Sequence, residues 1–233
     1  MKKIVILSGA GMSAESGIRT FRDADGLWEQ HDVMEVASID GWRRNPELVL
    51  RFYNQRRRQL KEVLPNAGHL ALTRLEAAYD VHIVTQNVDD LHERAGSSNI
   101  LHLHGELNKV RSTGKTSLVY EWQEDLQLGD LCESGHQLRP HIVWFGEMVP
   151  LMDKAVEILT KADIVIIIGT SMQVYPAAGL IAYARPSAAI YYIDPQPSIN
   201  YELSDRRRLE VISDRAAAAV PVLVERLLAE AGE

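Results

Sequence analysis

The chain has 233 residues, of which 46% are hydrophobic and 24% are charged, which is the composition of an ordinary globular protein. Its formal net charge of -7 argues against direct binding of nucleic acid, because nucleic-acid binders present a basic domain. The single cysteine, Cys132, excludes an intramolecular disulfide and a cysteine-rich zinc site, and no apolar run approaches the roughly 20 residues of a membrane span, so we expect a cytoplasmic protein without a membrane partner.

Short apolar runs rich in β-branched residues predict strands, because runs that do not alternate are typical of strands buried on both faces of a parallel sheet. They are residues 3–7, 81–84, 100–103, 141–145, 164–168 and 190–193. Helical patterns lie between them, at residues 46–63, 67–79, 153–162 and 221–231, and Asn45 and Pro46 suit the start of the first. This alternation predicts an α/β fold with a doubly wound, Rossmann-like parallel sheet.

Two stretches interrupt the alternation. Residues 19–63 contain a long helical pattern and no clear strand, and residues 108–138 are polar, with one short strand expected at 118–122. We therefore predict a smaller lobe made of two insertions, residues 27–63 and 108–138. The main domain would comprise residues 1–26, 64–107 and 139–233.

A glycine-rich turn follows the first predicted strand. Gly9, Gly11 and Ala14 form a Gly-x-Gly-x-x-Ala motif at an expected helix start, where a backbone without side chains lets a pyrophosphate approach the helix N-terminus. A turn that only packs closely is the alternative. A nicotinamide dehydrogenase would need a second strand ending in an acidic residue, and Asp25 does not end one.

Five sequence blocks then carry a resemblance to a known family. They are residues 9–21 (GAGMSAESGIRTF), 85–89 (TQNVD), 103–106 (LHGE), 145–147 (FGE) and 169–171 (GTS). Their order and spacing resemble the signature blocks of the sirtuins, above all the bacterial protein deacylases, and they span nearly the whole chain. The resemblance implies an enzyme that uses NAD to remove acyl groups from protein lysines, giving nicotinamide, O-acyl-ADP-ribose and free lysine.

The resemblance makes His104 and Asn87 the catalytic residues. His104 would be the general base toward a ribose hydroxyl, a role that suits an imidazole with a pKa near neutrality. Asn87 and Asp89 would line the nicotinamide pocket and Gln86 would contact the ribose, although Asn87 and Asp89 are also typical helix caps. A metal site on His102 and His104 is a weaker alternative, since no third ligand has suitable spacing.

Other expected contacts with NAD follow from the same blocks and from the later strand ends. Phe21 would shield the reactive ribosyl centre from water and Arg22 would meet ribose or phosphate, unless both belong to a plain surface loop. Asp194 stands where the family commonly has Asn, which weakens a side-chain role there. The complete set of expected contacts is Gly9, Ala10, Gly11, Ser13, Glu15, Phe21, Arg22, Gln86, Asn87, Asp89, Gly169, Thr170, Ser171, Asp194 and Ala216.

Residues 142–147 and 172–175 resemble the two edges between which sirtuins hold a peptide strand, a mode with little sequence selectivity. The expected contacts there are Val143, Trp144, Phe145, Gly146 and Val174. The partners would be proteins or peptides with acylated lysines.

Tyr53 and Arg56 lie three residues apart on a predicted helix and so share a face. They resemble the pair in sirtuins that prefer succinyl and malonyl groups, whose carboxylate a guanidinium can grip through two parallel bonds. The alternative is that Arg56 belongs to a solvated basic face with Arg57 and Arg58.

The chain departs from the family at the zinc site. Most sirtuins carry four zinc cysteines in the small lobe, but Ser112 stands where this set should begin and only Cys132 remains, with Glu133 and His136 as an unusual ligand set nearby. We predict NAD as cofactor, no zinc or other metal, and a lobe held by packing, to which Leu118, Tyr120 and Trp122 would contribute. We also expect a monomer.

Two other functions use the same residues. A mono-ADP-ribosyltransferase or NAD glycohydrolase would pass the ribosyl group to a protein side chain or to water, and would release nicotinamide without acyl-lysine. A non-catalytic module that binds NAD or ADP-ribose would not need a base at the ribose, so His104 argues against it.

Overall fold

The computed structural model describes residues 1–19, 27–28 and 31–232. Its larger part is a six-stranded sheet in which all neighbouring strands are parallel, with the order β11-β10-β9-β1-β4-β5. The strands are β1 (Lys3–Ser8), β4 (Asp80–Thr85), β5 (Ile100–His102), β9 (Ile164–Ile168), β10 (Ala189–Ile193) and β11 (Leu209–Ile212). The predicted α/β fold with a parallel sheet is confirmed.

Both faces of this sheet are buried, because successive side chains of a strand point to opposite faces. Ile4 and Ile6 pack on the face covered by α4 (Ala67–Arg74) and α8 (Ala216–Ala231). Val5 and Leu7 pack on the other face. That face is covered by α6 (Met152–Leu159), the 3-10 helix η5 (Ala177–Tyr183) and α7 (Tyr201–Ser204).

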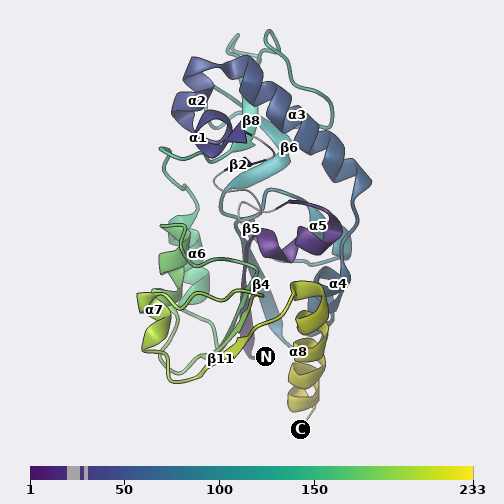
Figure 1. The fold of residues 1–233 in the computed structure, drawn as a ribbon, viewed down its shortest axis with the longest axis vertical. Helices are drawn as coiled ribbons and strands as arrows, with labels where there is room; N and C mark the ends of the chain where they lie inside the picture. Colours follow the sequence, from purple (N-terminus) through teal and green to yellow (C-terminus); the bar gives the residue numbers. More distant parts are fainter. Residues whose placement is uncertain (20–26, 29–30, 233) are drawn as a thin grey trace.

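A smaller lobe lies above the carboxyl ends of the parallel strands (Figure 1). Its antiparallel sheet has the order β7-β6-β8, from β6 (Gly105–Ser112), β7 (Val119–Glu121) and β8 (Leu138–Ile142). The remaining elements of this region are the short strands β2 (Leu27–Trp28) and β3 (His31–Asp32) and the helices α1 (Val33–Val36), α2 (Ile39–Arg44), α3 (Pro46–Glu62) and α5 (Leu91–Ala95). The predicted division into two lobes at given boundaries stays a proposal.

Helix α3 begins as the sequence predicts. The side chain of Asn45 accepts a hydrogen bond from the backbone N–H of Leu48, and Pro46 is the first helical residue. The buried face of α3 includes Phe52, Tyr53 and Arg57, whose Nε donates to the carbonyl oxygen of Leu107. The solvated basic face is therefore wrong for Arg57.

Three other expectations are corrected. The strand expected at residues 141–145 is β8, and it pairs with β6 in the small antiparallel sheet rather than in the parallel sheet. The helix expected after the glycine-rich turn is a pair of 3-10 turns, η1 (Ala10–Met12) and η2 (Ala14–Ser16). Helix α8 begins at Ala216, five residues before the expected start, and contains Pro221.

No helix in the described part of the chain is long and apolar enough to cross a membrane.

Candidate active site

A cavity of about 830 Å³ lies at the carboxyl ends of β1, β4, β9 and β10, where it meets the small lobe. Its volume is within the range of small-molecule and cofactor sites, and its position is the usual one for ligands of open parallel sheets. Most of the residues expected at the site line this cavity: Gly9, Ala10, Gly11, Ser13, Glu15, Tyr53, Gln86, Asn87, Asp89, His104, Val143, Trp144, Phe145, Gly146, Gly169, Thr170, Ser171, Val174, Asp194 and Ala216.

Glycines bring two of these strand ends into contact. The N–H of Gly11 donates to the carbonyl oxygen of Gly169 at 2.8 Å. A Cβ atom at Gly9 would lie 2.8 Å from the Gly169 oxygen, and one at Gly11 would lie 2.7 Å from the Gly169 Cα. Gly169 itself has a φ of +60°, which favours glycine. The turn thus packs closely and also leaves bare backbone on the cavity wall.

A hydrogen-bonded group of polar side chains follows β4. Ser13 Oγ donates to Asp89 Oδ2 at 2.9 Å, and Asn87 Nδ2 donates to Ser13 Oγ at 3.1 Å. Asp89 Oδ1 also accepts from the N–H of Leu91 at the start of α5, so its carboxylate caps this turn while it lines the cavity. Burial raises the pKa of Asp89, and these hydrogen bonds oppose that effect only in part.

His104 follows β5 and faces the same cavity. Its Nδ1 lies 3.2 Å from the carbonyl oxygen of Gln86, an acceptor, which assigns the ring hydrogen to Nδ1 and leaves Nε2 able to accept a proton. Burial lowers the pKa of His104, so its imidazole is neutral at pH 7. Gly105 has a φ of +85°, and a Cβ there would clash with the carbonyl oxygen of His141.

Both ring nitrogens of His102 have protein partners. Its Nε2 lies 2.7 Å from a Glu93 carboxylate oxygen, and its Nδ1 lies 3.0 Å from the carbonyl oxygen of Asn87. Among the residues that the structure describes, no three His, Cys, Asp or Glu side chains gather in a group that could hold a metal ion.

The far end of the cavity is formed by the ends of β9 and β10 and the start of α8. Gln86 Nε2 donates to Thr170 Oγ1 at 3.2 Å. Asp194 is buried and accepts a hydrogen bond from the N–H of Gln196 at 2.8 Å. Glu15 accepts from the N–H of Ala217 in the first turn of α8, so its carboxylate holds this helix against η2.

The expected peptide edge is tied to the rest of the site by its backbone. The N–H of Val143 donates to the carbonyl oxygen of His104 at 2.9 Å, and the N–H of Phe145 donates to that of Ala37 at 2.9 Å. Phe145 is 43% exposed and Val174, on the opposite wall, is 41% exposed. Both apolar walls are therefore open to an incoming chain.

Tyr53 and Arg56 are both buried on α3, so the solvated-face alternative is wrong for Arg56 as well. Tyr53 lines the cavity, whereas Arg56 is not among the lining residues and stacks its guanidinium 5.4 Å from the centre of the Phe52 ring. Burial raises the pKa of the Tyr53 phenol, which stays protonated at neutral pH. Arg58 alone keeps a largely exposed side chain, paired with Asp125.

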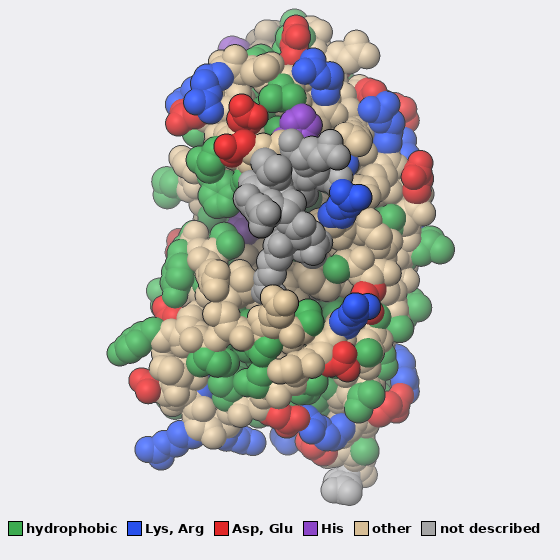
Figure 2. All heavy atoms as spheres, in the orientation of Figure 1, with side chains coloured by type: hydrophobic (Ala, Val, Ile, Leu, Met, Phe, Trp, Pro, Cys, Tyr) green, Lys and Arg blue, Asp and Glu red, His purple; other side chains and the backbone are tan. Residues whose placement is uncertain are grey.

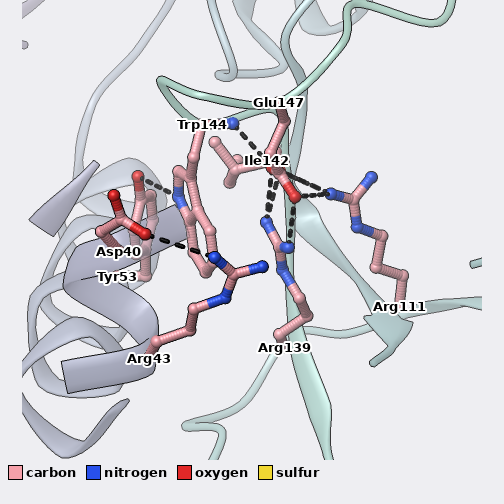
Figure 3. Close-up of polar contacts among 8 residues, drawn as sticks. All are labelled: Asp40, Arg43, Tyr53, Arg111, Arg139, Ile142, Trp144 and Glu147. Carbon is pink, nitrogen blue, oxygen red and sulfur yellow. Dashed lines mark hydrogen bonds and ion pairs between the residues drawn. The ribbon is translucent and has the colours of Figure 1, made fainter. Parts of the chain in front are cut away.

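Sequence reasoning missed an ionic cluster behind the peptide edge (Figure 3). Glu147 accepts two hydrogen bonds from Arg139, at 2.6 and 2.9 Å, and two from Arg111, at 3.2 and 3.1 Å. It also accepts from the backbone N–H of Trp144 at 2.9 Å. Glu147 was visible in the FGE block, but nothing in the sequence linked it to two arginines.

Cys132 lies in a cluster of buried hydrophobic side chains. Its side chain is buried with Leu50 and Leu126, and its Sγ lies 3.3 Å from Ser112 Oγ. The other members of this cluster are Val110 and Leu138, with Trp42, Leu118, Tyr120 and Trp122 packed against it. Phe21 and Arg22 lie outside the described residues.

Comparisons with known proteins place these features in a family. The Sir2 family profile matches residues 9–176. An NAD-dependent protein deacylase of Helicobacter pylori is 60% identical over 228 residues, with 98% of each chain covered, and one of Bacteroides thetaiotaomicron is 50% identical over 234 residues, with 98% of this chain and 99% of the relative covered. The structure of a Sir2 homologue bound to NAD has a TM-score of 0.87 and 38% identity, covering 99% of this chain and 91% of that one. A mutant Sir2 homologue bound to ADP-ribose has a TM-score of 0.88 and 37% identity, covering 99% and 94%.

Proposed function

The chain belongs to the Sir2 family and is an NAD-dependent protein deacylase, and we propose that it removes succinyl and malonyl as well as acetyl groups from protein lysines. The assignment as a deacylase rests on the family and on the named relatives. The acidic acyl groups are our own proposal, and they depend on Tyr53 and Arg56.

The residues that line the cavity are suited to bind NAD. Bare backbone at Gly9, Gly11 and Gly169 leaves room for a pyrophosphate on the cavity wall. Asn87 and Asp89 offer the amide and carboxyl groups that a carboxamide can pair with. Bound NAD supplies the ribosyl carbon that takes up the acyl oxygen.

His104 is the proposed general base. Its Nε2 can take a proton from a ribose hydroxyl, because its Nδ1–H is held by the carbonyl of Gln86 and its ring is neutral at pH 7. The backbone N–H of Val143, in the proposed peptide edge, donates a hydrogen bond to the carbonyl oxygen of His104. This bond fixes the position of the acylated lysine relative to the base.

The single observation that carries the acyl proposal is Tyr53 in the cavity wall with Arg56 buried one turn further along the same helix. A buried guanidinium favours an anionic partner over an uncharged acetyl group. A phenol that stays protonated can donate a hydrogen bond to the same carboxylate.

The test compares one lysine peptide in acetylated and succinylated forms, with NAD, by following peptide mass and nicotinamide release. Removal of both groups, with succinyl at least as fast, is the expected result. Removal of acetyl alone would overturn the acidic-acyl proposal and keep the deacylase. Nicotinamide release with both peptides unchanged would point to a ribosyl acceptor other than the acyl group.

The proposal also includes a cytoplasmic monomer without zinc that binds neither nucleic acid nor membranes. Acidic and basic side chains of the described residues are interspersed on the face in Figure 2, without a continuous basic patch, which supports the absence of nucleic-acid binding. Size-exclusion chromatography with light scattering tests the monomer.

A further inference from the structure

Trp144 makes a side-chain contact that its place in the peptide edge does not explain. Its indole Nε1 donates a hydrogen bond to the phenol oxygen of Tyr53 at 2.9 Å, and both side chains are buried (Figure 3). An indole nitrogen only donates, so the phenol oxygen accepts here. The phenol's own hydrogen is therefore directed away from the indole.

The indole has little freedom to move. The Arg139 guanidinium lies 3.5 Å from its ring centre, and Trp42 packs against it with ring centroids 5.6 Å apart. Glu147 holds Arg139 in two parallel bonds and also accepts from the backbone N–H of Trp144. One carboxylate thus holds both the backbone of Trp144 and the cation stacked on its ring.

This arrangement links α3 to the reacting centre. Val143, the neighbour of Trp144, donates its N–H to the carbonyl oxygen of His104. The phenol of Tyr53 is thereby connected through Trp144 and Val143 to His104, the proposed base toward the ribose hydroxyl.

We propose that Trp144 is a specificity-determining positioning residue, which fixes the Tyr53 phenol so that the site recognises the terminal carboxylate of a dicarboxylic acyl group. This inference rests on the proposed function, because it requires that Tyr53 contacts the acyl carboxylate. It adds the residue that orients this contact and the support of Arg139 and Glu147 behind it.

The test is a double-mutant cycle on Trp144→Phe and Tyr53→Phe. Trp144→Phe keeps an aromatic ring under Arg139 and removes the indole N–H, and it should lower the succinyl-to-acetyl ratio of kcat/KM by about fivefold to tenfold, which is the worth of one hydrogen bond. When Trp144→Phe is added to Tyr53→Phe, the succinyl-to-acetyl ratio of kcat/KM should be the same as in the Tyr53→Phe single variant. Dissociation constants of the two peptides without NAD give a second readout with the same expected pattern.

Trp122→Phe is the matched control, since it removes an indole N–H from the cluster around Cys132 and leaves the bond to Tyr53 in place, and its ratio should equal that of the wild type. The inference would be overturned if Trp144→Phe lowered kcat/KM equally for both peptides. It would also be overturned if the double variant lost the product of the two single-variant effects on the ratio. If Trp144→Phe does not fold, Arg139→Lys, which keeps the charge facing Glu147 but loses the stacked plane, must lower the ratio instead. Failure of the proposed function is distinguishable, because the wild type would then leave the succinylated peptide intact.

Discussion

The Nδ1 atom of His104 lies 3.2 Å from the carbonyl oxygen of Gln86, so the second residue after β5 is oriented by the residue after β4. Gln86 in turn donates its side-chain amide to Thr170, which follows β9. Three strand ends are joined in this way around the cavity. The ring orientation of the proposed base therefore depends on hydrogen bonds among the ends of the parallel strands.

Replacement of this base gives the first prediction. His104→Tyr should bind ADP-ribose nearly as the wild type does but lose about 10²–10⁴-fold in kcat, the usual contribution of a general base. Calorimetric titration with ADP-ribose and a nicotinamide-release assay measure the two quantities. His136→Tyr, at an exposed position, is the control, and near wild-type turnover in His104→Tyr would show that another group is the base.

The pH dependence of the reaction gives the second prediction. Burial lowers the pKa of His104 below the ordinary value of 6.5, so its neutral, proton-accepting form persists to a lower pH than in a free imidazole. The acidic limb of the kcat profile should therefore fall below pH 6.5. A limb at or above that value would contradict the assignment of His104 or the neutral ring.

Much of the fold follows from local sequence patterns, and strand β6 shows why some of it does not. The buried strands β1, β4 and β9 are apolar throughout, so their pattern is visible in the sequence. Strand β6 was missed because its buried end carries Arg111 and Ser112, whose polarity is offset by partners distant in sequence. A hydrophobic pattern in the sequence identifies buried apolar side chains, but it does not identify charged side chains that are buried in an ion pair.

The candidate site divides in the same way. His104 and Asn87 could be singled out because short blocks of sequence surround them, and both line the cavity. The bond from Trp144 to Tyr53 joins residues 91 positions apart, and no local pattern encodes it. Arg57 resembled a surface charge in a run of three arginines, but a carbonyl from β6 accepts its hydrogen bond in the interior.

Loss of the buried cation on α3 gives the third prediction. Arg56→Met should lower kcat/KM for the succinylated peptide about tenfold to a hundredfold, the worth of a charge-assisted hydrogen bond, and lower that for the acetylated peptide less. Arg58→Met removes a charge from the same helix at an exposed position and is the matched control. Equal losses with both peptides would mean that Arg56 supports the lobe and does not select the acyl group.

The fourth prediction concerns zinc. Ser112 Oγ accepts from the N–H groups of Gly114 and Lys115 and lies beside Cys132 in an apolar cluster, so packing and local hydrogen bonds hold this turn. A chelator should leave the melting temperature unchanged, and elemental analysis should find no stoichiometric zinc. Cys132→Ala should cost about 1 kcal/mol of unfolding free energy, as expected for a small buried side chain. A melting temperature that falls with chelator and recovers with added zinc would refute the prediction.

The fifth prediction concerns stability in acid. The rings of His69 and His92 lie with centroids 4.9 Å apart, and burial lowers the pKa of His69 to about 4 and that of His92 to about 3. In the unfolded chain both return to about 6.5, so the unfolded state takes up protons first as the pH falls. Stability is therefore complete above pH 6.5 and declines between pH 6.5 and about 4, by on the order of 3 kcal/mol for each of the two histidines.

Urea unfolding at pH 7 and at pH 4.5 measures this loss. His92→Gln, which cannot take up a proton, should show a smaller difference between the two pH values, although it is less stable at pH 7 because Ser8 Oγ loses one of its two partners, the His92 ring nitrogen at 3.0 Å. His136→Gln, at an exposed position, should keep the wild-type difference. If His92→Gln also kept the wild-type difference, the acid sensitivity would arise elsewhere. The reason is that glutamine has no group that takes up a proton in this pH range, so the unfolded variant cannot gain the proton that burial keeps off His92 in the folded wild type.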